Sequence, residues 1–203
     1  TRNDALLFTT TPTDGLTTTE AGGTASFTVA LSSAPTADVS FNITSSNTQE
    51  VTVFPGNLTF TIANSSDPDY WSTPQTVTLT GVDDAGAIDD NKLVTIVLAA
   101  ATSTDTNFDT LNPADVTVTN TDGDIADITV IPVSGLTTTE AATTATFTVV
   151  LDAKPTANVV IPISSGDTAE VTVSPASLTF TTGNWNAAQT VTLTGVDDAG
   201  AID

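Results

Sequence analysis

The chain contains one sequence unit twice. Residues 15–31 (GLTTTEAGGTASFTVAL) return as residues 135–151 (GLTTTEAATTATFTVVL), and EVTVFPGNLTFT at 50–61 returns as EVTVSPASLTFT at 170–181. Both copies then continue into the same fifteen letters, QTVTLTGVDDAGAID. A repeat of roughly 110–120 residues has the size of an ordinary domain. We therefore predict two related domains, at residues 1–124 and 125–203.

Within each copy the apolar residues alternate with Ser and Thr. In TASFTVAL (24–31) every second residue is apolar, and DVSFNI, NLTFTI, TVTLTGV, LVTIVLA and DVTVTN follow the same period. A period of two predicts half-buried β-strands. Short strands separated by Gly, Pro, Asn and Asp turns predict an all-β sandwich, and we find no helical spacing long enough to predict a helix.

The second copy lacks two of the predicted strands. The first copy adds LVTIVLA and DVTVTN after Asp89, whereas the second reaches Asp203, the equivalent position, without them. A sandwich without its last two strands would expose apolar core and unpaired strand edges. We expect residues 125–203 to be incomplete alone, so that either the chain is a segment of a longer repeat protein or a neighbouring copy donates strands. Residues 2–11 are the candidate for a donated or swapped edge strand.

The charge balance restricts the possible partners. The chain carries 24 acidic and three basic residues, a net charge of −21, and has neither Cys nor His. Nucleic acids and anionic membranes bind clustered Lys and Arg, so neither is an expected partner. No apolar run approaches the roughly 18 residues of a membrane span. Any bound metal must be hard and oxygen-ligated, which favours Ca²⁺.

The acidic residues are clustered. All four Glu residues fall at two positions of the repeat, Glu20 with Glu140 and Glu50 with Glu170. One Asp cluster lies at 83–90 and another at 122–127, whereas Asp38, Asp105, Asp109, Asp115 and Asp152 are expected to be surface or turn residues. Closely spaced carboxylates repel one another unless a cation neutralises them. A solvated, salt-adapted surface is the alternative explanation.

The opening TEAGGTASFTVALSSAPTADV, the middle EVTVFPGNLTFT, the loop GVDDAGAIDD and the closing VTNTDGD resemble a Calx-β repeat. That family is named after sodium–calcium exchangers, and similar repeats occur in large secreted or surface-anchored bacterial proteins. The resemblance implies tandem immunoglobulin-like β-sandwiches, the second incomplete, with calcium bound in loops at one end. Many such repeats carry a Glu-Gly-Asp-Glu run where this chain has Asp89-Asp90-Asn91-Lys92, which affects the number of ions expected.

The family pattern gives the following calcium-ligand candidates: Glu20, Asp83, Asp84, Asp89, Asp122 and Asp124 in the first copy, and Glu140, Asp197, Asp198 and Asp203 in the second. The clustering of acids near the boundary adds Asp127 to these candidates.

The predicted function is that of a structural repeat module in an extracellular or cell-surface stalk, adhesin or fibre. Calcium in the acidic loops at repeat ends would make it rigid, and its partners would be neighbouring repeats of the same or an identical chain. The alternative is a glycan- or protein-binding module that uses the insertion at 65–71 and Trp71. We do not expect an enzyme, because nothing in the sequence places two acids in an apolar, aromatic-lined cleft.

Overall fold

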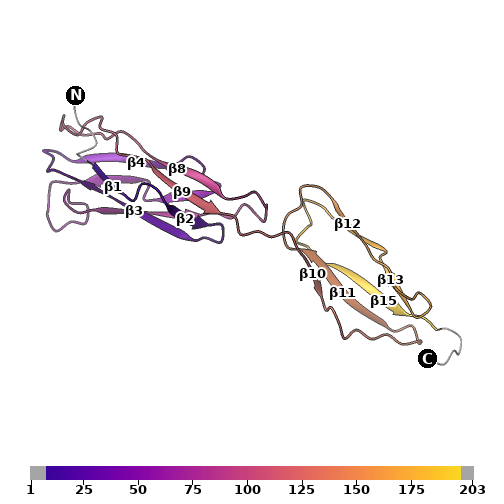
Figure 1. Ribbon diagram of the computed structural model, residues 1–203. Helices are drawn as coiled ribbons and strands as arrows, with labels where there is room; N and C mark the ends of the chain where they lie inside the picture. The colour runs from indigo at the N-terminus through magenta and orange to yellow at the C-terminus, as the bar shows by residue number, and fades with distance from the viewer. Residues whose placement is uncertain (1–7, 198–203) are drawn as a thin grey trace. The chain divides into compact units, whose positions relative to one another are not determined.

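The structure is a computed structural model that describes residues 8–197. Fifteen β-strands and no helix are found in this range (Figure 1), which confirms the predicted all-β class. The chain divides into two compact units. The first comprises Thr1–Asp84 and Asp89–Gly123, and the second comprises Ala85–Ile88 and Asp124–Asp203.

The first unit is a sandwich of two sheets. One sheet has the order β1-β3-β7-β5 and the other the order β2-β9-β8-β4-β6. All pairings are antiparallel except that of β2 with β9, which is parallel. The strands are β1 (Phe8–Thr11), β2 (Leu16–Thr19), β3 (Thr24–Leu31), β4 (Val39–Ser45), β5 (Val51–Phe54), β6 (Asn57–Phe60), β7 (Gln75–Gly81), β8 (Lys92–Leu98) and β9 (Val116–Thr121).

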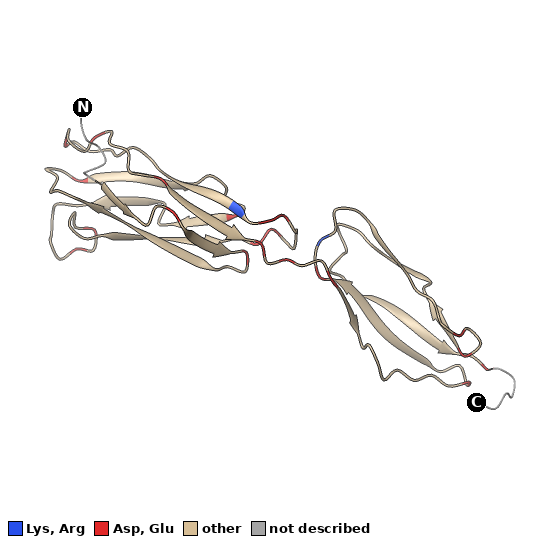
Figure 2. Cartoon of the chain, viewed as in Figure 1, with Lys and Arg blue, Asp and Glu red and all other residues tan. Residues whose placement is uncertain are grey.

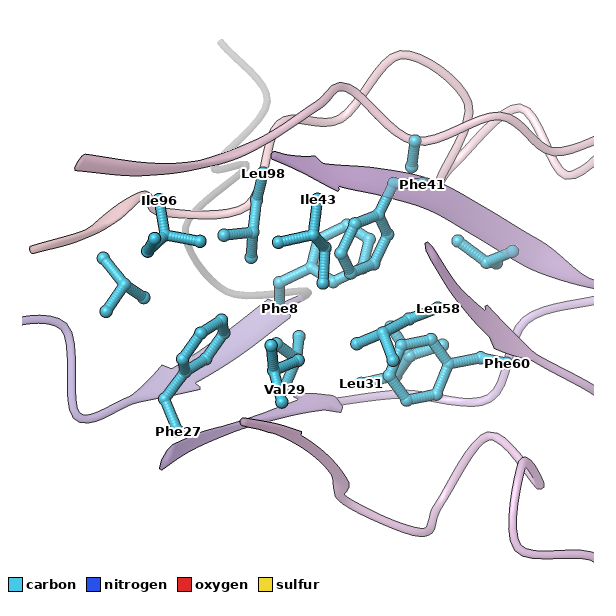
Figure 3. Packing of buried hydrophobic residues seen from close by; sticks show 14 of the residues in the cluster. Phe8, Phe27, Val29, Leu31, Phe41, Ile43, Leu58, Phe60, Ile96 and Leu98 are labelled. Carbon is cyan, nitrogen blue, oxygen red and sulfur yellow. The ribbon is translucent and has the colours of Figure 1, made fainter. Parts of the chain in front are cut away.

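The apolar alternation places one face of every strand in a common core. In β7 the burial pattern alternates strictly, and Val77 and Leu79 are fully buried. Figure 3 shows side chains of β3, such as Phe27, facing Ile96 of β8 across the core. Burying a side chain of this kind contributes about 1.5–3 kcal/mol. Strands β8 and β9, which have no counterpart among the described residues of the second unit, are therefore part of what stabilises the first.

The second unit has six described strands in two sheets, β10-β11-β15-β13 and β12-β14. The four-stranded sheet repeats the β1-β3-β7-β5 arrangement of the first unit, and the other sheet consists of two strands instead of five. The sandwich is therefore incomplete over the described residues. The strands are β10 (Ile128–Ile131), β11 (Thr144–Leu151), β12 (Val159–Pro162), β13 (Val171–Ser174), β14 (Ser177–Phe180) and β15 (Gln189–Gly195).

Strand β1 corrects one prediction. The described part of residues 2–11 pairs with β3 of its own unit, with Phe8 opposite Leu31 and buried in the core. In the second unit β10 pairs with β11 in the same way, with Ile128 opposite Leu151. Residues 8–11 are therefore the first strand of their own sandwich. The prediction of a donated or swapped strand is wrong for them, because Phe8 already fills the core beside Phe41, with ring centroids 5.6 Å apart.

Candidate metal centre

Two parallel strands bring two of the candidate carboxylates to one edge of the first unit. Strands β2 and β9 run side by side, and their last residues, Thr19 and Thr121, are opposite one another. Glu20 follows β2 and is 93% buried, since only 7% of its surface is exposed. The backbone N–H of Glu20 donates to the Thr121 carbonyl oxygen at 3.2 Å, and Gly123 N–H donates to Glu20 Oε2 at 3.3 Å. The segment after β9 is thus held against Glu20.

Asp122 holds the acidic loop between β7 and β8 at the same edge. Its Oδ2 accepts hydrogen bonds from the backbone N–H groups of Asp89, at 3.0 Å, and Asp90, at 3.1 Å. The backbone N–H of Asp122 in turn donates to Asn91 Oδ1 at 3.1 Å. These three bonds fix the position of the loop relative to the end of β9.

The glycine that opens GVDDAGAID allows this loop to begin beside β2. A Cβ at Gly81 would lie 2.2 Å from the carbonyl oxygen of Thr19 and 2.5 Å from Asn120 Oδ1. Real Cβ contacts are never so short with backbone, so only glycine fits. The close approach places Asp83 and Asp84, two and three residues further along, next to the end of β2.

The carboxylates converge in two groups that share Asp124. Glu20, Asp122 and Asp124 form one group and Asp83, Asp84 and Asp124 the other, and in each group one oxygen per residue lies within 4.8 Å of the others. Asp124 follows Asp122 by two residues. Oxygens that bind calcium at 2.3–2.6 Å lie at most about 5 Å apart across the ion. The donor type and the spacing of both groups therefore fit calcium. Figure 2 shows acidic residues gathered in the loops where β8 begins.

Asp89, a predicted ligand, is paired with a cation of the protein itself. Lys92 Nζ lies 3.1 Å from Asp89 Oδ2 and also donates to the Asp89 carbonyl oxygen. The hydrogen bond to Asp89 is the largest cause that raises the pKa of the Lys92 ammonium above its ordinary value. Neither carboxylate group includes Asp89. Its Oδ1 is buried and accepts no hydrogen bond from the described residues.

Asn120 is the centre of a buried polar network that was not predicted from the sequence. Asn120 is 1% exposed, and its Nδ2 donates to Glu50 Oε2 at 3.2 Å and to the Val82 carbonyl oxygen at 3.4 Å. Its Oδ1 accepts from Thr18 Oγ1 at 2.9 Å. Asn120 thereby joins β9, β2 and the start of the acidic loop. The available signal was the alternation of VTVTN, which puts an amide at an inward position.

The second-copy candidates do not form such a centre among the described residues. Glu140 is exposed in a turn, and Asp197 is exposed after β15. Neither belongs to a carboxylate group in the described part of the chain. Asp198 and Asp203 lie outside the described residues.

Two further aspartates have local roles. Asp127 accepts the N–H of Ile128 at 2.7 Å and is in neither carboxylate group. Asp105, expected to be a surface or turn residue, is 5% exposed. Its two oxygens accept the N–H groups of Thr36 and Asn107, each at 2.8 Å. These hydrogen bonds, Thr36 first, lower the pKa of Asp105. Asp105 thus has the second of its two expected roles, that of a turn residue, and it is buried because its carboxylate accepts hydrogen bonds from backbone N–H groups of the loop.

Trp71, the residue central to the binding-module alternative, packs against the protein. It is partly buried against the core of the first unit, and Trp185 has the same position in the second. Backbone hydrogen bonds join the two ends of the insertion before Trp71. The N–H of Thr61 donates to the Asp69 carbonyl oxygen at 2.7 Å, and the N–H of Trp71 donates to the Thr61 carbonyl oxygen at 2.9 Å. The Trp71 indole, packed against the buried residues, therefore contributes to the core of the first unit.

The comparisons with known proteins identify solved structures of low sequence identity. No family model matches the chain, and no curated protein does either. The calcium-binding domain CBD12 of CALX1.1 is 17% identical, with 93% of this chain and 75% of that chain covered and a TM-score of 0.43. CBD12 from CALX1.2 is 14% identical, with 96% of this chain and 76% of that chain covered and a TM-score of 0.43.

A different class of protein is also similar. The periplasmic chaperone SfaE is 9% identical, with 57% of this chain and 58% of that chain covered and a TM-score of 0.39. None of the described residues belongs to a helix long and apolar enough to cross a membrane. The described residues form β-sandwich units, and the chain is similar to the calcium-binding domain CBD12 of CALX1.1 and CALX1.2 and to the periplasmic chaperone SfaE.

Proposed function

We propose that this chain is a Calx-β-like structural repeat module of an extracellular or cell-surface assembly, and that its first repeat binds calcium. The observation that carries the proposal is the convergence of Glu20, Asp83, Asp84, Asp122 and Asp124 in two groups with oxygens within 4.8 Å. Three separate chain segments supply these carboxylates. An ion bound among them would link the segments directly.

Calcium is the cation that this arrangement favours. Every charged donor is a carboxylate, and the chain offers no His or Cys, so a soft or imidazole-preferring metal lacks its usual ligands. The segments are loops after strands, which can adapt to the six to eight oxygens that calcium takes. Glu20 is buried and accepts the N–H of Gly123, and a cation beside it would further offset the cost of burying its charge.

A structural role fits this chemistry better than recognition or catalysis. The carboxylates lie where β2 and β9 end and where the chain continues into its next segment. An ion there would stiffen the end of a repeat, and stiffness is useful in a series of repeats. The partners would be neighbouring repeats of the same or an identical chain, by strand donation among other contacts. Trp71 is used in packing, which weakens the case for a glycan-binding module.

The test is thermal unfolding of the full chain in calcium and in chelator. An ion that binds only the folded state stabilises it by about 2.7 kcal/mol at a hundredfold excess over Kd. We expect a higher Tm in calcium, and we expect Asp83→Asn combined with Asp84→Asn to remove most of the shift. Asp14→Asn is the matched control, because Asp14 is exposed and precedes the opposite end of β2.

Identical melting curves with and without calcium would contradict the proposal. Magnesium sharpens the test, since it requires a tight octahedron and dehydrates reluctantly. If magnesium and calcium stabilised equally at equal ionic strength, diffuse screening of a net charge of −21 would explain the effect, and the salt-adapted surface would be the better account.

A further inference from the structure

We infer that a groove in the first unit binds a neutral sugar, with the carboxylate of Asp38 as its strongest hydrogen-bond acceptor. The groove has a volume of about 640 Å³ and is lined by residues 36–38, 62–63 and 102–104. Pockets for small molecules are about 300–1,000 Å³ in volume. All three segments belong to the first unit. The inference goes beyond the proposed structural role and depends neither on calcium nor on Trp71.

Hydrogen bonds fix the three walls of the groove to one another. Asp38 Oδ1 accepts the backbone N–H of Ile62 at 3.0 Å, and the hydroxyl group of Ser103 donates to the Asp38 carbonyl oxygen at 2.8 Å. Ser40 and Thr102 form a β-bridge, in which each backbone N–H donates to the other residue's carbonyl oxygen, at 3.1 and 2.8 Å. The groove is therefore formed before a ligand binds, which lowers the cost of binding.

The buried carboxylate of Asp105 supports the same groove from behind. Asp105 directly follows the wall of residues 102–104 and is not itself part of the lining. Its Oδ2 accepts the N–H of Thr36, in the opposite wall, at 2.8 Å, and its own N–H donates to Ser103 Oγ at 3.0 Å. Asp105 thus joins two walls of the groove.

Several polar groups of the groove are available to a ligand. Asp38 is exposed, and its Oδ2 has no hydrogen-bond partner among the described residues. The hydroxyl groups of Thr102 and Thr104 have none within residues 8–197 either, and both side chains are exposed. Ile62, which is 43% exposed, adds an apolar surface to the lining. The groove therefore offers one anionic acceptor, two hydroxyl groups and an apolar wall.

This combination fits a neutral sugar better than other ligands. Sugar hydroxyl groups can donate to the carboxylate, in the stronger, charge-assisted kind of hydrogen bond, and can exchange hydrogen bonds with threonine hydroxyl groups. The C–H face of the ring can pack against Ile62. An anionic ligand is disfavoured by Asp38 and by the net charge of −21. Among the described residues, the carboxylate groups spaced for a metal do not include Asp38.

The second copy indicates which substitution tests this site. APTADV at 34–39 returns as KPTANV at 154–159, so that Asn158 has the position of Asp38. An asparagine keeps one side-chain oxygen to accept the N–H of Ile62 and lacks the negative charge. Asp38→Asn is thus a variant that should fold normally and bind the sugar less tightly.

The experiment titrates the isotope-labelled full chain, in chelator, with the methyl glycosides of glucose, galactose and mannose, one at a time, and follows backbone amide shifts by NMR. We expect at least one glycoside to shift the amides of residues 36–38, 62–63 and 102–104 saturably, with Kd in the millimolar range. Asp38→Asn should weaken this binding at least about tenfold, because hydrogen bonds to charged groups contribute most. Asp14→Asn removes the same charge from an exposed residue outside the groove and should leave the binding unchanged.

Three results would overturn the inference. One is that none of the three glycosides shifts these amides, and another is that Asp38→Asn and Asp14→Asn bind the same glycoside equally. The third is that lysinamide shifts the amides and no glycoside does, which would identify a site for a cationic amine.

Two further variants refine the result. Thr102→Val removes one hydroxyl group and should weaken the binding about two- to tenfold. Asp83→Asn combined with Asp84→Asn changes residues that do not line the groove and should leave sugar binding unchanged. Sugar binding by that double variant would separate this inference from the proposed calcium site, so that each can fail without the other.

Discussion

One pentapeptide, LTTTE, has two structures in this protein. At residues 16–20 it forms β2 and delivers Glu20, 93% buried, to the carboxylate groups. At residues 136–140 the same letters form no strand, and Glu140 is exposed. Local preference is identical in the two places, so the difference lies in the partner: β2 is a strand because β9 pairs with it. Strand preference mostly reflects such neighbours.

The comparison also applies to the candidate metal centre. Its ligands come from the end of β2, the loop after β7 and the segment after β9. The second unit has counterparts for the first two and, among its described residues, none for the third. A calcium centre of this design therefore requires strand β9 and the segment that follows it. We expect the two units to differ in core burial and in the hydrogen bonds around Asn120, and variants at equivalent positions test this difference.

The largest expected effect is the loss of stability when one of two equivalent core phenylalanines is truncated. Phe27 is 1% exposed and Phe147 is half-buried. Because truncating a buried Phe costs about 3–5 kcal/mol, Phe27→Ala should destabilise the first unit by that amount, and Phe147→Ala should destabilise the second by clearly less. Each unit contains one tryptophan packed against its core, so denaturant unfolding of Trp185→Phe and Trp71→Phe backgrounds reports the units separately. Equal losses would show that the second core is as well covered as the first.

The next effect concerns the network under the carboxylates. Asn120→Ala removes the donor to Glu50 Oε2 and the acceptor for Thr18 Oγ1. Leaving a buried polar group without its partner costs about 1–3 kcal/mol. We expect the first unit to lose that much stability in denaturant unfolding and to lose part of its calcium-induced rise in Tm. Asn57→Ala, on the exposed end of β6, is the control. An unchanged unfolding midpoint would show that water replaces the amide.

The sequence predicts the fold well because its strands are amphipathic. The period-two alternation in TASFTVAL corresponds residue by residue to the inward face of β3. The repeat also predicts that the described part of the second unit has fewer strands than the first, since the letters for β8 and β9 occur once in the given sequence. Both predictions depend on residues near one another in the chain or on copies that can be aligned.

The site is less predictable because it depends on which ends of the strands meet. Glu20, Asp122 and Asp124 are brought together by the parallel pairing of β2 with β9, and no local pattern specifies that pairing. Asp89 was a candidate by its position in the loop, yet Lys92 three residues later pairs with it. Asn120 was overlooked because a polar residue near the end of a strand is usually interpreted as a turn residue.

A smaller effect is expected from one hydroxyl group. Thr18 is 1% exposed and donates to Asn120 Oδ1 at 2.9 Å, whereas Thr138 has no counterpart of Asn120 among the described residues. A net hydrogen bond contributes about 0.5–1.5 kcal/mol, so Thr18→Val should lower the unfolding free energy of the first unit by this amount. Thr138→Val should leave the second unit nearly unchanged. Comparable losses in the two units, measured with the two tryptophan backgrounds, would contradict the difference.

The smallest expected effect is a pH-dependent loss of stability that is confined to the first unit. Asp105 lies in the loop between β8 and β9, for which the described second unit has no counterpart, and hydrogen bonds from Thr36 and Asn107 lower its pKa. A lowered pKa means that the carboxylate stabilises the fold above its unfolded pKa of about 3.9, and that this contribution is lost as pH falls through the folded value. Asp105→Asn keeps one acceptor oxygen and loses the charge. It should therefore destabilise the first unit slightly at pH 7 and by less at pH 3, with the second unit unaffected at either pH. Urea unfolding midpoints, followed by the fluorescence of Trp71 and of Trp185, measure the stability of the first and the second unit at each pH. A destabilisation of the same size at the two pH values would mean that shape, and not charge, makes Asp105 fit its loop.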